Sequence, residues 1–495
     1  MPNLITATGP DDIRRLIDSA DIRAADLSNF IEKTSYVADY RKFLDACTVI
    51  PEGYYLPKPI VFYTVSGRGE LTPVAIQLER SGELFTPNMP NAENAWLLAK
   101  MLTNCAGQTL HDVGFHQLMT HQICSMVSIA LFSEEVFNPA TNPPSTAPFQ
   151  EHPVFKLLRP HVSKALEFQQ NIYNADYHPD AKSFPDTRET NGALGVYNIG
   201  FVYDLIFSCG RIGNYQLQDR IYNAPDFRFL DLAIPKDAKK RGVENTPFSY
   251  PYLHDATHWY EAIASFTSQF VDTCYAAGDQ SVATDLQLQR FFNKLIPAFN
   301  YVDGQKQANR FPDKVITKDA LKEVLTMFIW QFSVQHTVVN DGAYNHAAFV
   351  PNASTLMYAP PAGKPSSQWS VDDVLKCLPS NEQGYKELGG MNFMDIQINA
   401  SVTGQGPYPG TMLGRMTLEP SIDILQDSYA FGDLNLRAVV DGFYQAIRKI
   451  EDAITLRQAK DVARYLERYP GSESVPETVV FSLIVPTNVM ATIQT

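Results

Sequence analysis

The chain has 495 residues, of which 45% are apolar and 12% aromatic, enough for one large core or about two to four average domains. Its formal net charge is −14, and its Lys and Arg residues are scattered. This argues against nucleic-acid binding, because a phosphate-binding surface needs clustered positive charge. The six cysteines are widely spaced, so neither a zinc site nor a disulfide framework is indicated. Without a secretory signal or an apolar run of about 18 residues, we expect a cytoplasmic protein with no transmembrane segment.

The N-terminal part of the chain is predicted to combine short helices with one hairpin. Residues 1–50 show apolar positions at helical spacing, with Asp11 and Asp12 placed to cap one helix. Lys58–Leu78 alternates around Ser-Gly-Arg-Gly, which is typical of a β-hairpin. We expect a helical segment at 1–55 that packs on a main domain at 56–495.

The rest of the chain is dominated by helical patterns. A long apolar stretch at 96–132 predicts a buried central helix. Prolines interrupt the pattern at 138–148 and again at 176–195. Further helices are predicted at 255–277, 282–297, 318–340 and 436–459. The expected fold class is therefore mainly α, with two long central helices and a small β-hairpin or sheet near the N-terminus.

Two histidines in the first central helix raise a question of geometry. His116 and His121 lie five residues apart in the sequence HQLMTH. In a regular α-helix this step turns by roughly 500°, which leaves the side chains about 140° apart. They can share a metal ion only if the helix is widened, as in a π-bulge. The alternative is a pair of buried, hydrogen-bonded histidines, which is the commoner case.

The second central helix carries His336 and Asn340 four residues apart, a spacing that places both on one face. They could equally be core polar groups that hydrogen-bond to neighbours. Two such helices together make a shared metal ion less of a coincidence. Imidazole and oxygen ligands without a thiolate suit iron or manganese with open coordination positions.

Several segments resemble, in order, the catalytic domain of lipoxygenases. Counting from Lys100 selects His116 and His121, rather than His111 and His116, as the pair in the family's H-x-L-x-T-H signature. The matching segments span about residues 55–365 and read LTPVAIQL, WLLAK, HQLMTH, EHPVFKLLRPH, HWYEAIASFTSQFVDTCY, QHTVVNDGAY and AFVPNASTLMYAPP.

The resemblance implies a non-haem iron, or manganese, bound by His116, His121, His336, Asn340 and the main-chain carboxylate of Thr495. In such enzymes a metal-bound hydroxide, with no separate side-chain base, removes a bis-allylic hydrogen from a polyunsaturated fatty acid. O₂ then adds to give a hydroperoxide. The chain resembles the compact bacterial and fungal lipoxygenases that lack an N-terminal β-barrel, so any membrane contact is expected to be transient.

Some positions depart from the family pattern. Ala343 and Asp112 replace both ends of a hydrogen bond beside the ligands, and Ser125 stands where glutamate is often found. The helix that arches over the substrate is interrupted by prolines, and its substrate-binding position falls on Ile172 or Ala175 according to the alignment. The alternatives are therefore a hydroperoxide isomerase or an oxidase of another metabolite with the same fold, and a non-catalytic lipid-binding protein.

Overall fold

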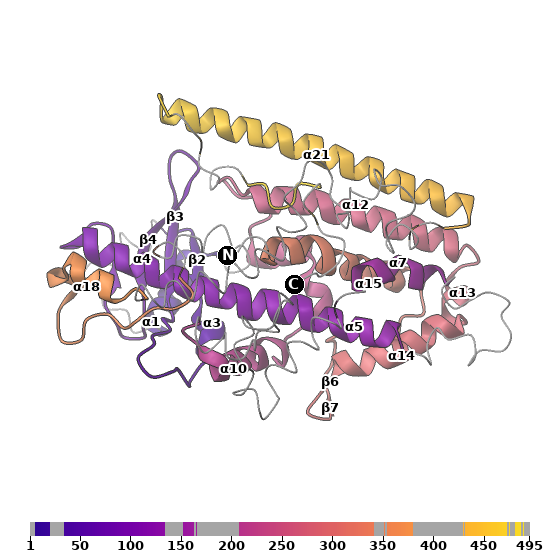
Figure 1. The fold of residues 1–495 in the computed structure, drawn as a ribbon, viewed down its shortest axis with the longest axis horizontal. Coiled ribbons are helices and arrows are strands. Elements are labelled where there is room, and N and C mark those ends of the chain that lie inside the picture. Colours follow the sequence, from indigo (N-terminus) through magenta and orange to yellow (C-terminus); the bar gives the residue numbers. More distant parts are fainter. Residues whose placement is uncertain are drawn as a thin grey trace, which may run out of the picture.

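The computed structural model describes residues 5–19, 34–133, 152–162, 165, 207–340, 351, 354–379, 429, 431–472, 475, 481–486 and 489. Within these ranges the protein is mainly helical, with a five-stranded antiparallel sheet beside one end of the central helix (Figure 1). The predicted fold class is confirmed. None of the described helices is both long and apolar enough to cross a membrane.

The sheet contains the predicted hairpin and three further strands in the order β1-β2-β3-β4-β5. The hairpin is β3–β4, paired from Ile60 opposite Gln77 to Val65 opposite Leu71. The strands are β1 (Ile5–Ala7), β2 (Tyr36–Asp39), β3 (Ile60–Val65), β4 (Leu71–Gln77) and β5 (Leu84–Phe85).

The expectation of short helices alone in residues 1–50 is wrong. Helices α1 (Pro10–Ser19) and α3 (Arg41–Leu44) are present, but β1 and β2 are strands. Strand β2 is buried on both faces, with Tyr36 and Ala38 in the main core and Val37 in a second core on the other side. Burial on both faces removes the polar–apolar alternation by which a strand is recognised. The division at residue 55 stays a prediction, and the β2–β3 pairing spans it.

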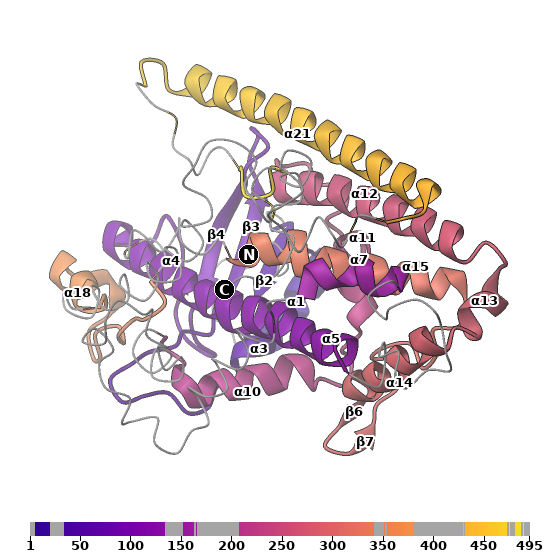
Figure 2. The same ribbon diagram turned by 45° about the vertical axis from the view of Figure 1, so that its right-hand side comes forward.

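The central helix runs without a break from Ala92 to Leu131, as predicted, through the middle of the molecule (Figures 1 and 2). It consists of α4 (Ala92–Thr109), η1 (Leu110–Gln122) and α5 (Ile123–Leu131). The second central helix begins as α15 (Lys318–Trp330), continues as η7 (Gln331–Gln335) and stays helical to residue 340. Segments η1 and η7 contact each other where the candidate ligands lie.

The remaining elements surround these two helices. The longest are α12 (Pro251–Cys274) and α21 (Leu434–Arg468), which lie side by side along one edge (Figures 1 and 2). The others are α7 (Pro153–Val162), α10 (Gly210–Tyr222), η6 (Phe229–Leu232), α11 (Ile234–Arg241), α13 (Asp279–Ala283), α14 (Leu286–Asn300), β6 (Tyr301–Val302), β7 (Gln305–Lys306), η8 (Ser366–Gln368) and α18 (Val371–Lys376).

Helices α12 and α21 also hold part of the C-terminal segment. Phe266 stacks on Phe443 with ring centroids 4.3 Å apart. The Trp259 indole donates a hydrogen bond of 2.8 Å to the carbonyl of Ile484, which is itself buried. The chain is therefore anchored to α12 close to its C-terminus.

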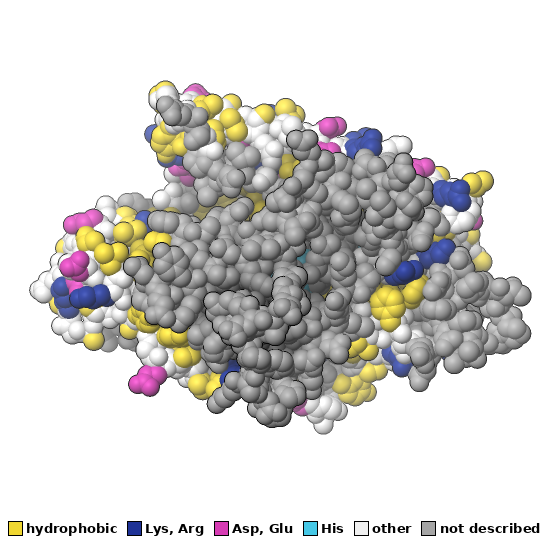
Figure 3. Space-filling view, in the orientation of Figure 1, with side chains coloured by type: hydrophobic (Ala, Val, Ile, Leu, Met, Phe, Trp, Pro, Cys, Tyr) yellow, Lys and Arg dark blue, Asp and Glu magenta, His cyan; other side chains and the backbone are white. Residues whose placement is uncertain are grey.

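The described surface has no gathered positive charge on the face shown in Figure 3. Lys and Arg side chains are dispersed around its edge and alternate with Asp and Glu. This agrees with the exclusion of nucleic-acid binding from the sequence.

Candidate metal centre

Three imidazole rings from the two central helices converge in the interior. The Nε2 atoms of His116 and His121 lie 2.9 Å apart, and those of His121 and His336 lie 3.2 Å apart. The side chains are 6%, 1% and 1% exposed. Their ligand atoms all lie within 4.8 Å of one another, and among the described residues this is the one such group of His, Cys, Asp or Glu.

The spacing of His116 and His121 is explained by the local helix geometry. All 13 residues from Leu110 to Gln122 form a π-helix, in which hydrogen bonds run from residue i to i+5. A step of five residues therefore brings the two rings to one face, with centroids 4.7 Å apart. The predicted widening of the central helix between these histidines is confirmed.

A second π-helical segment, which the sequence analysis missed, precedes the third histidine. Gln331–Gln335 form η7, and regular helix resumes at His336. The Gln331 side chain donates a hydrogen bond of 2.8 Å to the carbonyl of Met119, between the two histidines of η1. This bond joins the two ligand helices. The one signal in the sequence was a glutamine at a buried position of an otherwise apolar helix.

The protonation of the rings favours metal binding. Burial, followed by the neighbouring imidazoles, lowers the pKa of His116 and of His121 well below 6.5. Both rings are therefore neutral near pH 7, the form in which imidazole binds a metal ion. Neutral nitrogens that face one another at hydrogen-bonding distance point their lone pairs at a common centre, which a cation can occupy.

The separations of the nitrogens also fit a metal ion. With a metal–nitrogen distance of about 2.1 Å, two ligands at right angles lie about 3.0 Å apart and two tetrahedral ligands about 3.4 Å apart. The observed 2.9 and 3.2 Å are closer to the right-angle arrangement. The three histidines thus fit a transition-metal ion with further coordination positions.

Asn340 and His111 are placed beside this cluster. Asn340 is 3% exposed and hydrogen-bonds to the His116 side chain. His111 points elsewhere: its Nε2 lies 2.5 Å from the carbonyl of Val339, next to Asn340. His111 therefore connects the two ligand helices and is outside the group of converging nitrogens.

The departures at Asp112 and Ser125 have local partners. Gln108 donates a hydrogen bond of 3.1 Å to the Asp112 carboxyl, and burial raises the pKa of Asp112 to about 7. The Ser125 hydroxyl donates to the carbonyl of His121 at 2.8 Å. Both side chains thus bond within their own helix and leave the histidine rings untouched.

The structure brings together His116, His121, His336 and Asn340. Thr495, Ile172, Ala175 and Ala343 lie outside the described residues. The roles of these four residues therefore stay predictions.

Comparison with known proteins identifies relatives of this fold and site. A family model described as Lipoxygenase matches residues 224–388. The chain is 26% identical over 341 residues to an "Allene oxide synthase-lipoxygenase protein" of Plexaura homomalla, which covers 68% of the chain and 28% of the relative. It is 27% identical over 332 residues to the human "Hydroperoxide isomerase ALOXE3", covering 66% of the chain and 41% of the relative. It is also 27% identical over 345 residues to the human "Polyunsaturated fatty acid lipoxygenase ALOX12", covering 68% and 45%.

Among solved structures, the anaerobic crystal structure of a LOX variant in complex with arachidonate has a TM-score of 0.70. The likeness covers 96% of this chain and 61% of that one at 20% sequence identity, and so supports the fold. The chain spans less than half the length of the three relatives named above. From the family model, the relatives and the shared fold together, the chain belongs to the lipoxygenase family.

Proposed function

We propose that the protein is a non-haem metal dioxygenase that converts a polyunsaturated fatty acid and O₂ into a fatty-acid hydroperoxide. The observation that carries this proposal is the convergence of three buried, neutral imidazoles on one face of a π-helix within a lipoxygenase fold. Imidazole with oxygen ligands suits iron, or manganese. The name of one relative and the arachidonate bound to a structural neighbour support the class of substrate.

The proposed ligands are His116, His121, His336, Asn340 and the terminal carboxylate of Thr495. Asn340 is supported by its burial one turn after His336 and by its hydrogen bond to His116. The assignment of Thr495 is supported by the anchoring of Ile484 on α12 and by the complete burial of Val489. A bound iron or manganese ion would supply the one-electron redox chemistry that a weak bis-allylic C–H bond requires.

The residues around the histidines keep them in place and exclude water. Hydroxyls of Thr120 and Ser125 donate to the carbonyls of His116 and His121, at 2.5 and 2.8 Å. The Gln331 bond to Met119 fixes the second helix against the first. Orientation of ligands by such surrounding hydrogen bonds sets the properties of a metal site. Exclusion of water protects a radical intermediate from side reactions.

The test combines metal analysis with oxygen consumption. Protein loaded with Fe²⁺ or Mn²⁺ should hold about one ion per chain, consume O₂ with linoleate or arachidonate, and form a conjugated diene. Stearate, which has no bis-allylic carbon, is the matched control and should give no consumption. Absence of stoichiometric metal after loading would contradict the proposal and favour a non-catalytic lipid-binding protein.

A hydroperoxide isomerase is the second candidate function. It is favoured by Asp112, whose carboxyl bonds to Gln108 in place of the family's link between the ligand helices. Relatives named as a hydroperoxide isomerase and as an allene oxide synthase-lipoxygenase support the same reading. In this case the metal-loaded protein would consume a fatty-acid hydroperoxide without O₂ uptake. An oxidase of another metabolite would instead consume O₂ with neither class of lipid.

A further inference from the structure

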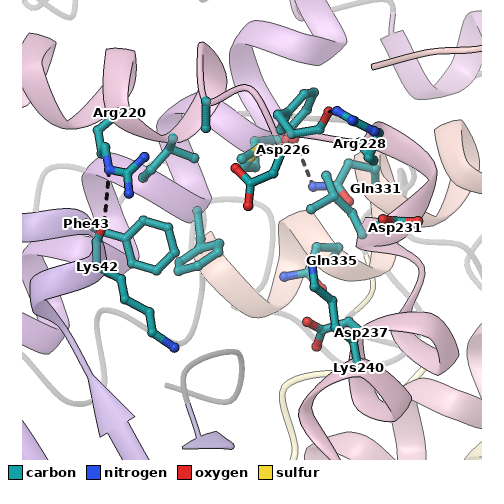
Figure 4. A pocket seen from close by; sticks show the side chains of 16 residues that line it. Lys42, Phe43, Arg220, Asp226, Arg228, Asp231, Asp237, Lys240, Gln331 and Gln335 are labelled. Atoms are coloured by element: carbon teal, nitrogen blue, oxygen red, sulfur yellow. Dashed lines mark hydrogen bonds between the residues drawn. The ribbon is translucent and has the colours of Figure 1, made fainter. Parts of the chain in front are cut away.

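The two ligand helices also form one wall of a cavity of about 300 Å³ that none of the three histidines lines (Figure 4). Phe115, directly before His116, contributes to this wall, and so does Gln335, directly before His336. In Figure 4, Lys42, Phe43 and Arg220 lie on one side of the space, and Gln331, Gln335 and Asp231 lie across from them. The cavity is therefore separate from the metal centre but shares its helices.

The inner part of the cavity is apolar. Phe43 and Phe115 meet edge to face with ring centroids 6.3 Å apart. Met119 and Ile221 extend this apolar surface along η1 and α10. Such a surface suits a hydrocarbon chain, and a flexible thioether adapts to its shape.

The rim of the cavity carries unpaired positive charge. In the described part of the chain, no carboxylate lies within ion-pairing distance of Lys42, Arg220 or Arg228. One of the rim carboxylates, Asp237, is already paired with Arg241 at 2.6 Å. The charged lining residues are Lys42, Arg220, Arg228 and Lys240 against Asp226, Asp231 and Asp237. With Asp237 neutralised, cations outnumber carboxylates in a chain whose net charge is −14.

We infer that this cavity binds an amphipathic organic acid of medium chain length. Its carboxylate lies beside Lys42 and Arg220, and its hydrocarbon chain packs on Phe43, Phe115 and Met119. A volume of about 300 Å³ is at the lower end of the range of small-molecule sites, which fits such an acid better than a whole phospholipid. This site is independent of the proposed function, because its ligand needs no double bond and touches no histidine.

The test is a calorimetric titration of the full-length protein with decanoate, a saturated acid that the proposed oxygenation cannot consume. Decanol, which has the same chain but no charge, should bind at least tenfold more weakly. Lys42→Met keeps the aliphatic stem and should weaken decanoate about tenfold or more, since loss of one charge contact of about 1.4 kcal/mol is a tenfold change. Lys239→Met removes an exposed cation on α11 that does not line the cavity, and should leave the affinity unchanged.

A second variant keeps the inference falsifiable if Lys42→Met disturbs folding. Ala224 lines the cavity, and Ala224→Phe should fill it and abolish decanoate binding, with an unchanged circular dichroism spectrum. If decanoate binds equally to wild type and to both variants, it binds elsewhere and the inference is wrong. Activity toward linoleate does not enter either measurement, so failure of the proposed function leaves this test intact.

Discussion

The two faces of the ligand helices differ in how they treat charge and water. The metal face holds three imidazoles that burial keeps neutral, with no acidic side chain among the converging nitrogens. The cavity face holds charged side chains around an apolar floor. The same backbone therefore presents a cation site on one side and an anion-binding surface on the other.

This difference teaches that the π-helix changes more than the spacing of two ligands. Widening the helix brings His116 and His121 to the metal face, while Phe115 and Met119 between and beside them line the cavity. Substitutions on one face should therefore leave the other largely intact, unless they alter the helix itself.

The largest effect is expected on the metal face. His121→Ala removes the ring that lies close to both other histidines, and should reduce bound metal to a small fraction of one ion per chain. Activity toward the fatty acid should fall at least 100-fold. Metal analysis and oxygen consumption measure both quantities. His258→Ala on the exposed side of α12 is the control and should behave as wild type. Full metal content in His121→Ala would separate this histidine from the site.

The next largest effect is expected from extension of the chain after Thr495. Added residues convert the terminal carboxylate into an amide, which is a poor ligand, so activity should fall at least tenfold. The thermal midpoint should be nearly unchanged, because the anchor between Trp259 and Ile484 remains. The control carries the same extension at the N-terminus. Equal activity of both extended proteins would exclude carboxylate coordination.

A smaller effect is expected from Gly114→Ala, which tests the helix between the two faces. A Cβ at Gly114 would lie 2.7 Å from Ile221 Cδ1 and 3.1 Å from Leu110 Cδ1, so α10 or η1 must move. We expect a loss of about 1–2 kcal/mol of stability, measured by chemical denaturation. Gly107→Ala is the matched control in α4, where the nearest atom is the Tyr40 hydroxyl at 3.6 Å. Its stability should stay the same or rise by up to about 1 kcal/mol. Equal stability of Gly114→Ala and wild type would show that this contact relaxes freely.

The smallest effect concerns the buried carboxyl of Asp112. Its pKa is about 7 in the folded protein and near 3.8 when exposed, so the folded state holds the extra proton between these pH values. Stability is therefore highest below about pH 4 with respect to this group, and is lost as pH rises to about 7. Asp112→Asn should remove this dependence. In denaturation experiments on metal-free protein, the variant should gain on wild type by about 1 kcal/mol between pH 5 and 7. Parallel pH profiles would show that Asp112 does not titrate in this range.

The sequence predicted the helical architecture because apolar residues at helical spacing reflect burial directly. The central helix from residue 92 to residue 131 and the helices α12, α14, α15 and α21 follow that pattern. Strand β2 escaped prediction because both of its faces are buried. A short, uniformly apolar stretch such as Tyr36–Ala38 carries no period from which to choose a strand over a helix.

The candidate site was predictable in part. The five-residue step between His116 and His121 required a widened helix, and the structure has one. The second π-helical segment was unpredictable, because His336 and Asn340 already share a face in a regular helix and so placed no demand on the residues before them. The cavity was likewise invisible in the sequence, since its walls come from α3, η1, α10, η6, α11 and η7.

The contact between His121 and His336 joins residues 215 positions apart in the chain. Contacts of such long sequence separation form late, after the intervening chain has been ordered. During synthesis, therefore, no ribosome-bound intermediate that ends before α15 can contain all three imidazoles. Whatever metal the protein carries must be acquired at or after completion of the chain, and so reflects the ions available at that moment.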